Sequence, residues 1–96
     1  MALEDKRHRI DHDGPTLLWE QVAADIEADI TSGRLAPHAK MPTELELAEQ
    51  YGVARVTVRR AVQDLAARGL LLVVHGRGTF VAARPAESAD PSTDGE

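Results

Sequence analysis

Residues 41–81 constrain the fold more than any other part of this chain, because two helix patterns separated by one turn are followed there by a hairpin pattern. The first helix pattern begins at Thr43, whose hydroxyl can accept a backbone N–H, and Glu46 three residues later completes a capping box. Gly52 follows Tyr51 directly, and glycine readily adopts the positive φ of a sharp turn between helices. This order predicts a helix-turn-helix.

The second helix pattern begins near Ala54 and has two unlike faces. Apolar residues recur at helical spacing, which predicts one buried face, and they are Val58, Ala61, Val62 and Leu65. Arg55 and Arg59 lie four residues apart on the other face, so they project together near the start of the helix. Arginine there can pair with guanine or hold a phosphate in the manner of a recognition helix. On charge pattern alone, a solvated basic face is an equally good interpretation.

A hairpin pattern follows Gly69, which we expect to end the second helix. Residues 70–74 are apolar and partly β-branched, and residues 79–81 form a second short strand pattern. Between them, residues 75–78 have the sequence His-Gly-Arg-Gly, whose two glycines suit a tight tip. A basic, glycine-rich hairpin beside a basic helix is typical of the wing of a winged helix-turn-helix.

Another helix is predicted from Pro15–Thr16 to Ser32–Gly33, where an apolar residue recurs every four positions. These residues are Leu18, Val22, Ile26 and Ile30. Trp19 lies beside this stripe and is expected to pack against the domain. Residues 35–42 are expected to form a loop that leads to the capping box.

Residues 1–14 mix charges without an apolar stripe, which predicts a flexible arm. His8 and His12 lie four residues apart with Asp11 and Asp13 nearby, a pattern that metal sites also use. The segment offers no evident core or neighbouring groups to orient such ligands, so we expect no metal site. Its basic residues are candidates for contact with a DNA backbone, and they are Lys6, Arg7 and Arg9.

Composition limits the classes of function. A chain of 96 residues with 43% apolar content fits one small domain. The absence of cysteine excludes disulfides, thiolate zinc sites and a cysteine nucleophile, and it fits a reducing cytoplasm. Nothing resembles a signal peptide, and no apolar run approaches the length of about 18 residues that suggests a membrane span. No phosphate loop or catalytic set is apparent, so we expect neither an enzyme nor a bound cofactor.

The net charge of −5 is unevenly distributed along the chain. Residues 55–84 contain six arginines and a single acid, Asp64, whereas residues 85–96 contain four acids and no basic residue. A local excess of arginine suits nucleic acid despite the negative total. We therefore expect a winged-helix domain at residues 15–82 and a disordered acidic tail at residues 83–96.

The motifs of residues 18–81 resemble the N-terminal domain of the GntR family of bacterial transcription regulators. In family order they are WEQVAADIEADITSGRL, MPTELELAEQYGVARVTVRRAVQDL and GLLLVVHGRGTFV. The resemblance implies a mostly α fold with a small β-hairpin, in which three helices carry a two-stranded wing. It also implies a sequence-specific DNA-binding regulator, most simply a repressor, located in the cytoplasm on the nucleoid. The family fold can add a minimal strand near residues 35–42.

The resemblance further implies which positions contact DNA. They are Thr43, Glu44, Ala54, Arg55, Val56, Thr57, Arg59, Arg60, His75, Gly76, Arg77 and Gly78. Three nearby positions depart from the family, since Leu45 replaces a common arginine, Ala54 a capping Ser or Thr, and Val56 a frequent Thr. Each departure removes a polar group, so Arg55, Thr57, Arg59 and the wing are expected to carry more of the binding. His38 stands at a usual loop glycine and concerns loop geometry.

The expected partner is double-stranded DNA with a palindromic operator, because helix-turn-helix proteins commonly bind paired half-sites. In relatives a further domain binds a small metabolite and supplies most of the dimer contact. This chain has no room for it, so we expect no effector ligand here and a monomer or weak dimer that pairs on DNA. The alternative is a winged-helix module that makes protein contacts through its hairpin and third helix. The arginine pair and the basic wing favour DNA.

Overall fold

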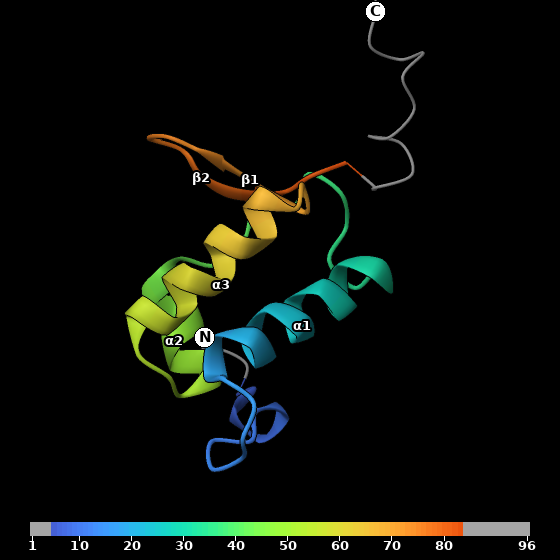
Figure 1. Cartoon of the computed structure of the whole chain (residues 1–96). Coiled ribbons are helices and arrows are strands. Elements are labelled where there is room, and N and C mark those ends of the chain that lie inside the picture. The colour runs from blue at the N-terminus through green and yellow to red at the C-terminus, as the bar shows by residue number, and fades with distance from the viewer. Residues whose placement is uncertain (1–4, 84–96) are drawn as a thin grey trace, which may run out of the picture.

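The computed structural model describes residues 5–83. In chain order its elements are the 3₁₀ turn η1 (Arg7–Arg9), α1 (Leu18–Thr31), α2 (Glu44–Tyr51), α3 (Arg55–Ala67), β1 (Leu71–Val74) and β2 (Gly78–Val81). The three helices pack together, and the hairpin lies against the C-terminal half of α3 (Figure 1). The predicted set of three helices and a two-stranded wing is confirmed. Residues 84–96 of the predicted tail lie outside the described residues.

α1 begins at Leu18, later than the sequence predicts, and Leu17 is its N-cap without a side-chain hydrogen bond. The side chain of Gln21 explains the delay, because its Nε2 donates to the carbonyls of Thr16 at 2.9 Å and Asp11 at 3.0 Å. These bonds hold the preceding residues in an irregular turn instead of a helical one. Across residues 5–83, no helix combines the length and the apolar character that crossing a lipid bilayer requires.

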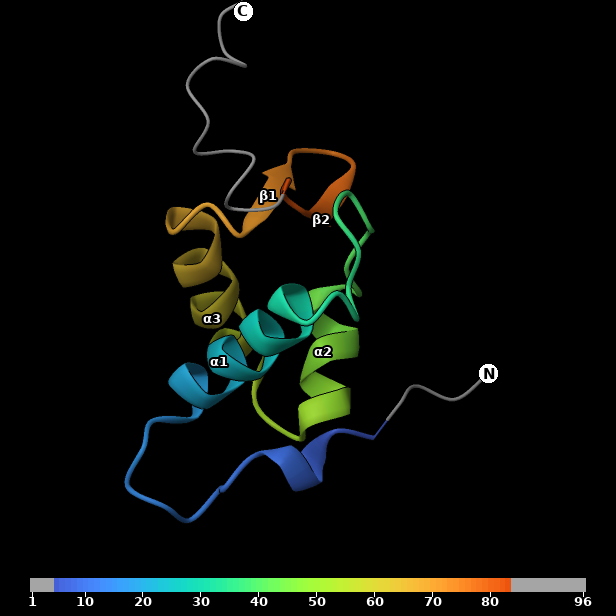
Figure 2. The ribbon, with the colours of Figure 1, turned by 90° about the vertical axis from the view of Figure 1, so that its right-hand side faces the viewer.

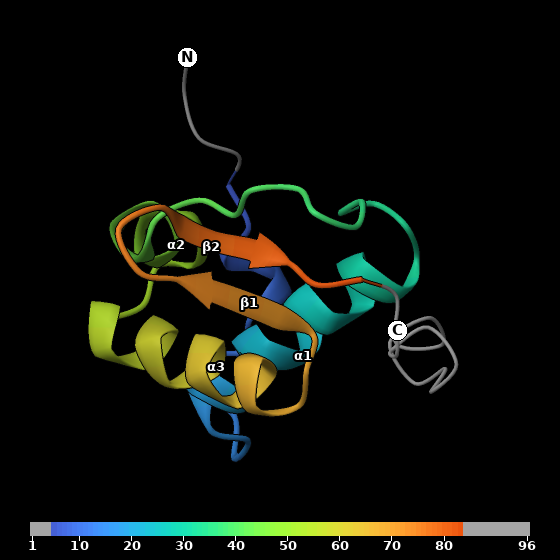
Figure 3. The same cartoon turned by 90° about the horizontal axis from the view of Figure 1, so that it is seen from above.

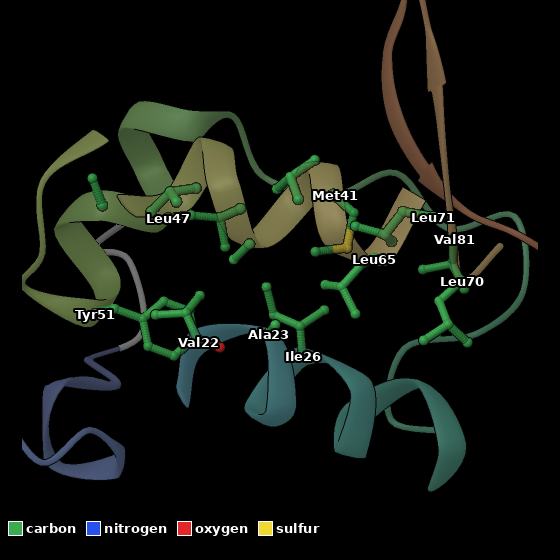
Figure 4. Close-up of a cluster of buried hydrophobic side chains, with 14 of the residues drawn as sticks. Val22, Ala23, Ile26, Met41, Leu47, Tyr51, Leu65, Leu70, Leu71 and Val81 are labelled. Carbon is green, nitrogen blue, oxygen red and sulfur yellow. The ribbon is translucent and has the colours of Figure 1, made fainter. Parts of the chain in front are cut away.

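The core lies between the three helices and the base of the hairpin (Figure 4). The largest fully buried side chains are Tyr51, Ile26, Leu47, Leu65, Val22, Val58 and Val81. The predicted apolar face of α3 is buried along its whole length, from Val58 to Leu65. Burying each large apolar side chain stabilises the fold by roughly 1.5–3 kcal/mol relative to exposure. The core therefore holds α3 by one face and leaves the other available.

The hairpin is antiparallel, with Leu71 opposite Val81 and Leu72 opposite Phe80. The loop before α2 adds an isolated bridge between Lys40 and Phe80. It is the minimal strand that the family fold allows. His38 in this loop has a φ of 70°, the conformation that glycine usually supplies, so this residue does concern loop geometry.

Residues 5–14 pack on the domain, which differs from the mobile arm that the sequence predicts. Ile10 is only 6% exposed and belongs to the core. The Arg9 guanidinium donates to the carboxylates of Asp25 at 3.1 Å and Asp29 at 3.5 Å. A single apolar residue makes no periodic pattern, and its partners lie far away in the sequence. No local sequence pattern therefore reveals this packing.

Candidate nucleic-acid interface

The start of α3 is an exposed part of the predicted site. Ala54 caps the helix with an extended backbone, but its methyl group cannot accept a hydrogen bond as a Ser or Thr would. Arg55 is exposed, Val56 is 65% exposed and Thr57 is half-buried. The first backbone N–H groups and the positive end of the helix dipole lie beside Arg55. An anion such as a phosphate is favoured at this place.

Arg59 is held against α2 by Glu44. Its Nη2 donates to Glu44 Oε1 at 3.1 Å, and its Nε lies 3.3 Å from both carboxylate oxygens. The hydrogen bond and the charge of Glu44 raise the pKa of Arg59 above its ordinary value. Both side chains are partly exposed, at 51% for Arg59 and 34% for Glu44, so solvent screens the pair and its contribution to stability is small. Arg59 can therefore exchange the carboxylate for a phosphate or a base at low cost.

Arg60 is a predicted site residue that the structure places against α1 and not with the other predicted residues of α3. Its guanidinium lies 4.6 Å from the centre of the Trp19 ring on α1, in a cation–π contact. The half-buried Trp19 is a packing residue, as the sequence predicts. Neighbouring positions on a helix point in different directions, so Arg59 faces α2 while Arg60 faces α1.

The start of α2 is fixed by the predicted capping box. The Thr43 hydroxyl accepts from the Glu46 amide at 3.1 Å, and Glu46 Oε1 accepts from the Thr43 amide at 2.9 Å. Leu45, in the same first turn, is 50% exposed. Leu45 is therefore a surface residue and not part of the core.

The wing tip turns tightly through residues 75–77. The Arg77 amide donates to the carbonyl of Val74 at 2.9 Å, and Gly76 has a φ of 82°. Gly78 opens β2 with a φ of 124°, which a residue with a side chain rarely adopts. His75 and Arg77 are exposed on either side of Gly76. The glycines thus shape the turn, and the two basic residues remain accessible.

A cavity of about 280 Å³ lies between the wing and the start of α2. Both apolar and polar residues line it, and the polar or charged ones are Lys40, Thr43, Glu44, Arg77 and Thr79. No sequence pattern points to Lys40, because it is a lone lysine in a loop. The bridge to β2 places it beside the wing, where its Cε would lie 3.0 Å from a Cβ added to Gly78. Lys40 therefore adds a basic group to the interface.

The start of α3, α2 and the wing tip lie on one side of the domain, seen at the left of Figures 1 and 3. Apart from Arg60, the predicted site residues of these three elements are thereby brought to a common surface. We call this surface the basic face and define it by Lys40, Thr43, Glu44, Ala54, Arg55, Val56, Thr57, Arg59, His75, Gly76, Arg77 and Gly78. It presents guanidinium, ammonium and hydroxyl groups beside a helix N-terminus, a combination suited to binding anions.

Residues 18–81 match the family model described as bacterial regulatory proteins of the gntR family, and this match covers more than half of the chain. The chain belongs to the GntR family. The HTH-type transcriptional repressor NagR of Bacillus subtilis (strain 168) is 39% identical over 80 residues, which cover 83% of this chain and 33% of NagR. The histidine utilization repressor of Klebsiella aerogenes is 41% identical over 75 residues, which cover 78% of this chain and 31% of that repressor. The chain spans about a third of the length of these curated GntR relatives.

Solved structures of GntR proteins share the fold. AraR(DBD) in complex with operator ORX1 matches with a TM-score of 0.69 and 40% identity, covering 85% of this chain and 99% of that one. YtrA from Sulfolobus acidocaldarius, a GntR-family transcription factor, matches with a TM-score of 0.69 and 32% identity. The match covers 77% of this chain and 62% of the YtrA chain. These similarities confirm the winged helix-turn-helix that the sequence predicts.

Proposed function

We propose that this chain binds double-stranded DNA sequence-specifically and represses transcription. In this proposal α3 enters the major groove, and the wing contacts the backbone or the minor groove. The observation that carries it is the exposed start of α3, where Arg55 and Arg59 lie four residues apart on the basic face. The complex of AraR(DBD) with an operator, a chain of the same fold and family, supports the same partner.

Each part of the basic face has a role in this proposal. Arg55 and Arg59 pair with base edges, because a guanidinium can donate two parallel hydrogen bonds to guanine. Thr57 and the N–H groups of the helix start hold a phosphate. Lys40 and Arg77 neutralise phosphates beside the wing, which strengthens binding to any sequence. Glu44 holds Arg59 against α2 until DNA takes the place of the carboxylate.

We propose a palindromic operator bound by two copies of the chain, which associate weakly without DNA. Helix-turn-helix proteins commonly bind half-sites spaced by about one helical turn of DNA, roughly 34–36 Å. The proposed partner places the protein on the nucleoid in the cytoplasm. Sedimentation at micromolar concentration, with and without a duplex, tests the assembly. A tight dimer in the absence of DNA would contradict this part of the proposal.

The test of DNA binding starts from a duplex selected by the intact chain from a random pool. Arg55→Ala should lower affinity for the selected duplex by about 1–3 kcal/mol, with a smaller loss on a scrambled duplex. Arg68→Ala is the matched control, because Arg68 pairs with Glu27 and Asp64 and lies outside the basic face. Equal losses of Arg55→Ala on both duplexes would assign Arg55 to phosphate contact.

A protein-contact module remains the second candidate, and one observation favours it. Leu72 and Val73 on β1 are 56% and 57% exposed, and exposed apolar side chains can mark a site of contact with another protein. A salt titration of duplex binding separates the two functions. DNA binding predicts a steep fall of affinity with salt, whereas a protein-contact module has no salt-sensitive affinity for any duplex.

A further inference from the structure

The C-terminal end of α2 is covered by residues distant in the sequence. The last carbonyls of a helix have no partners within it. Here the Lys6 amide donates to the carbonyl of Gln50 at 2.8 Å. His12 Nε2 lies 3.2 Å from the carbonyls of both Tyr51 and Gly52, a position from which it can donate to either. Figure 2 shows this N-terminal segment running past the lower end of α2.

The same segment is anchored to α1. Arg9 donates to Asp25 and Asp29, and the buried Ile10 joins the core. The Tyr51 hydroxyl donates to Asp25 Oδ2 at 2.6 Å, so Arg9 and the end of α2 share one carboxylate of α1. Burial and the hydrogen bond to Asp25 raise the pKa of Tyr51 above its ordinary value, which keeps the hydroxyl protonated as a donor. The segment thus ties α2 to α1 at several points.

The turn that these contacts hold leads directly into α3. Gly52 has a φ of 68°, and Arg55 begins α3 three residues later. With so few residues between the helices, the orientation of the turn sets the direction in which α3 starts. The stem of Arg7 also lies against Gly52, since a Cβ added there would be 2.6 Å from Arg7 Cγ and Cδ.

We propose that residues 5–14 form a brace that fixes the turn between α2 and α3 and so positions the start of α3 for DNA, with His12 as a positioning residue. The brace lies outside residues 18–81, the part that matches the GntR family model. The inference rests on the proposed DNA-binding function. It assigns to this segment the placement of Arg55, in which Lys6 and Arg9 take part through the acids of α1 and not through a contact with DNA.

Three variants of the intact chain test the brace. His12→Ala removes the donor to the two carbonyls, and His12→Gln restores an N–H donor at a similar reach. His8→Ala is the matched control, because His8 is an exposed histidine of the same segment. Amide hydrogen exchange is followed at Gly52, Val53, Thr57 and Val58, and at Ile26 in α1 as a reference. Affinity for the selected and scrambled duplexes is measured in parallel.

We expect His12→Ala to speed exchange at the turn and the start of α3 about threefold to tenfold, the effect of losing one hydrogen bond in a local opening. Exchange at Ile26 should not change. Affinity for the selected duplex should fall as well, by no more than the same factor, because DNA binding must then restore an orientation of the start of α3 that the free chain no longer favours. His12→Gln should recover both quantities, and His8→Ala should alter neither.

Each other outcome contradicts a defined part of the inference. Unchanged exchange at the turn would show that His12 does not hold it. If exchange at Ile26 rises by the same factor, His12 stabilises the whole fold and does not hold the turn in particular. Faster exchange at the turn with unchanged duplex affinity would separate the brace from DNA binding. If the unaltered chain binds no duplex in a salt-dependent way, the proposed function fails, and exchange alone then decides whether the turn is braced.

Discussion

The two ends of α2 are satisfied in different ways. At the N-terminal end, Thr43 and Glu46 exchange hydrogen bonds within one helical turn. At the C-terminal end, the carbonyls receive donors from Lys6 and His12, which lie about 40 residues away in the sequence. A local cap is visible as a sequence pattern, whereas a cap from a distant segment has no pattern until the chain folds.

The two ends of α2 also differ in their accessibility to a ligand. The N-terminal end is open, with Leu45 half exposed and Glu44 in a screened ion pair that can be exchanged. The C-terminal end is covered by residues 5–14 and tied to α1 through Tyr51 and Asp25. One end of the helix is thus available to a ligand, while the other holds the turn that leads to α3.

The largest expected effect tests whether the C-terminal end is covered at all. Ile10→Ala should lower the free energy of unfolding by about 2–5 kcal/mol, the usual cost of such a truncation in a core. Leu17→Ala is the control, because Leu17 is 55% exposed and surface changes usually cost less than about 0.5 kcal/mol. Urea unfolding measures both variants. If both variants lose equally little stability, Ile10 does not pack into the core, and the C-terminal end of α2 is not covered as the structure shows.

The next effect isolates the contact of the brace with the turn. Gly52→Ala and Gly33→Ala both place a side chain at positive φ, at 68° and 86°, which costs about 1–2 kcal/mol each. Only Gly52 also meets the stem of Arg7, whereas Gly33 has open space. Gly52→Ala should therefore cost about 1 kcal/mol more, the lower end of overpacking penalties. Thermal unfolding of the pair gives the difference.

The double variant Gly52→Ala with Arg7→Ala sharpens this result. Removing the Arg7 stem should bring the loss close to that of Gly33→Ala, since only the backbone strain remains. If the double variant is no more stable than Gly52→Ala alone, the stem of Arg7 does not press on the turn.

A smaller effect is expected at the N-terminal end. Thr43→Ala removes the acceptor of the capping box and should cost about 1 kcal/mol of stability. Thr16→Ala is the matched control, because Thr16 is exposed and lies outside the helices. Chemical unfolding of the two variants measures the difference. A Thr43 variant as stable as the control would mean that water satisfies this end equally well.

The features that the sequence predicts correctly are those encoded within a few residues. The capping box at Thr43, the positive φ of Gly52, the buried face of α3 from Val58 to Leu65 and the glycine wing all depend on neighbours along the chain. The other positions of the basic face follow from the family resemblance, whereas Lys40 was not predicted. The family resemblance supplied the order of these parts.

The features that were missed depend on partners far away. Gln21 bonds Asp11 and Thr16 and thereby delays α1, and Ile10 packs into a core formed by later helices. Arg60 carries the same charge as Arg59, so composition cannot tell that it stacks on Trp19. For Ile10 and Arg60 the decisive contact follows from the packing of α1 against the other helices, which no local spacing specifies, whereas the bonds of Gln21 reach back only to the segment just before α1.

The smallest effect on stability is expected at Leu45, where the open end of α2 meets the proposed DNA. Because Leu45 is 50% exposed, Leu45→Arg should change the free energy of unfolding by less than about 0.5 kcal/mol. The added charge should increase affinity for any duplex and steepen the slope of log affinity against log salt by about 0.9, as one further neutralised phosphate does. Val73→Arg is the matched control, since Val73 is 57% exposed and lies outside the basic face.

Duplex titrations at several salt concentrations and a thermal melt of each variant provide the measurements. A gain limited to the selected duplex would mean that the new arginine contacts a base, because phosphates are common to all sequences. A large fall in melting temperature without a gain in affinity would place Leu45 against the core. An equal gain from Val73→Arg would show that position does not matter, so that the N-terminal end of α2 has no special relation to DNA.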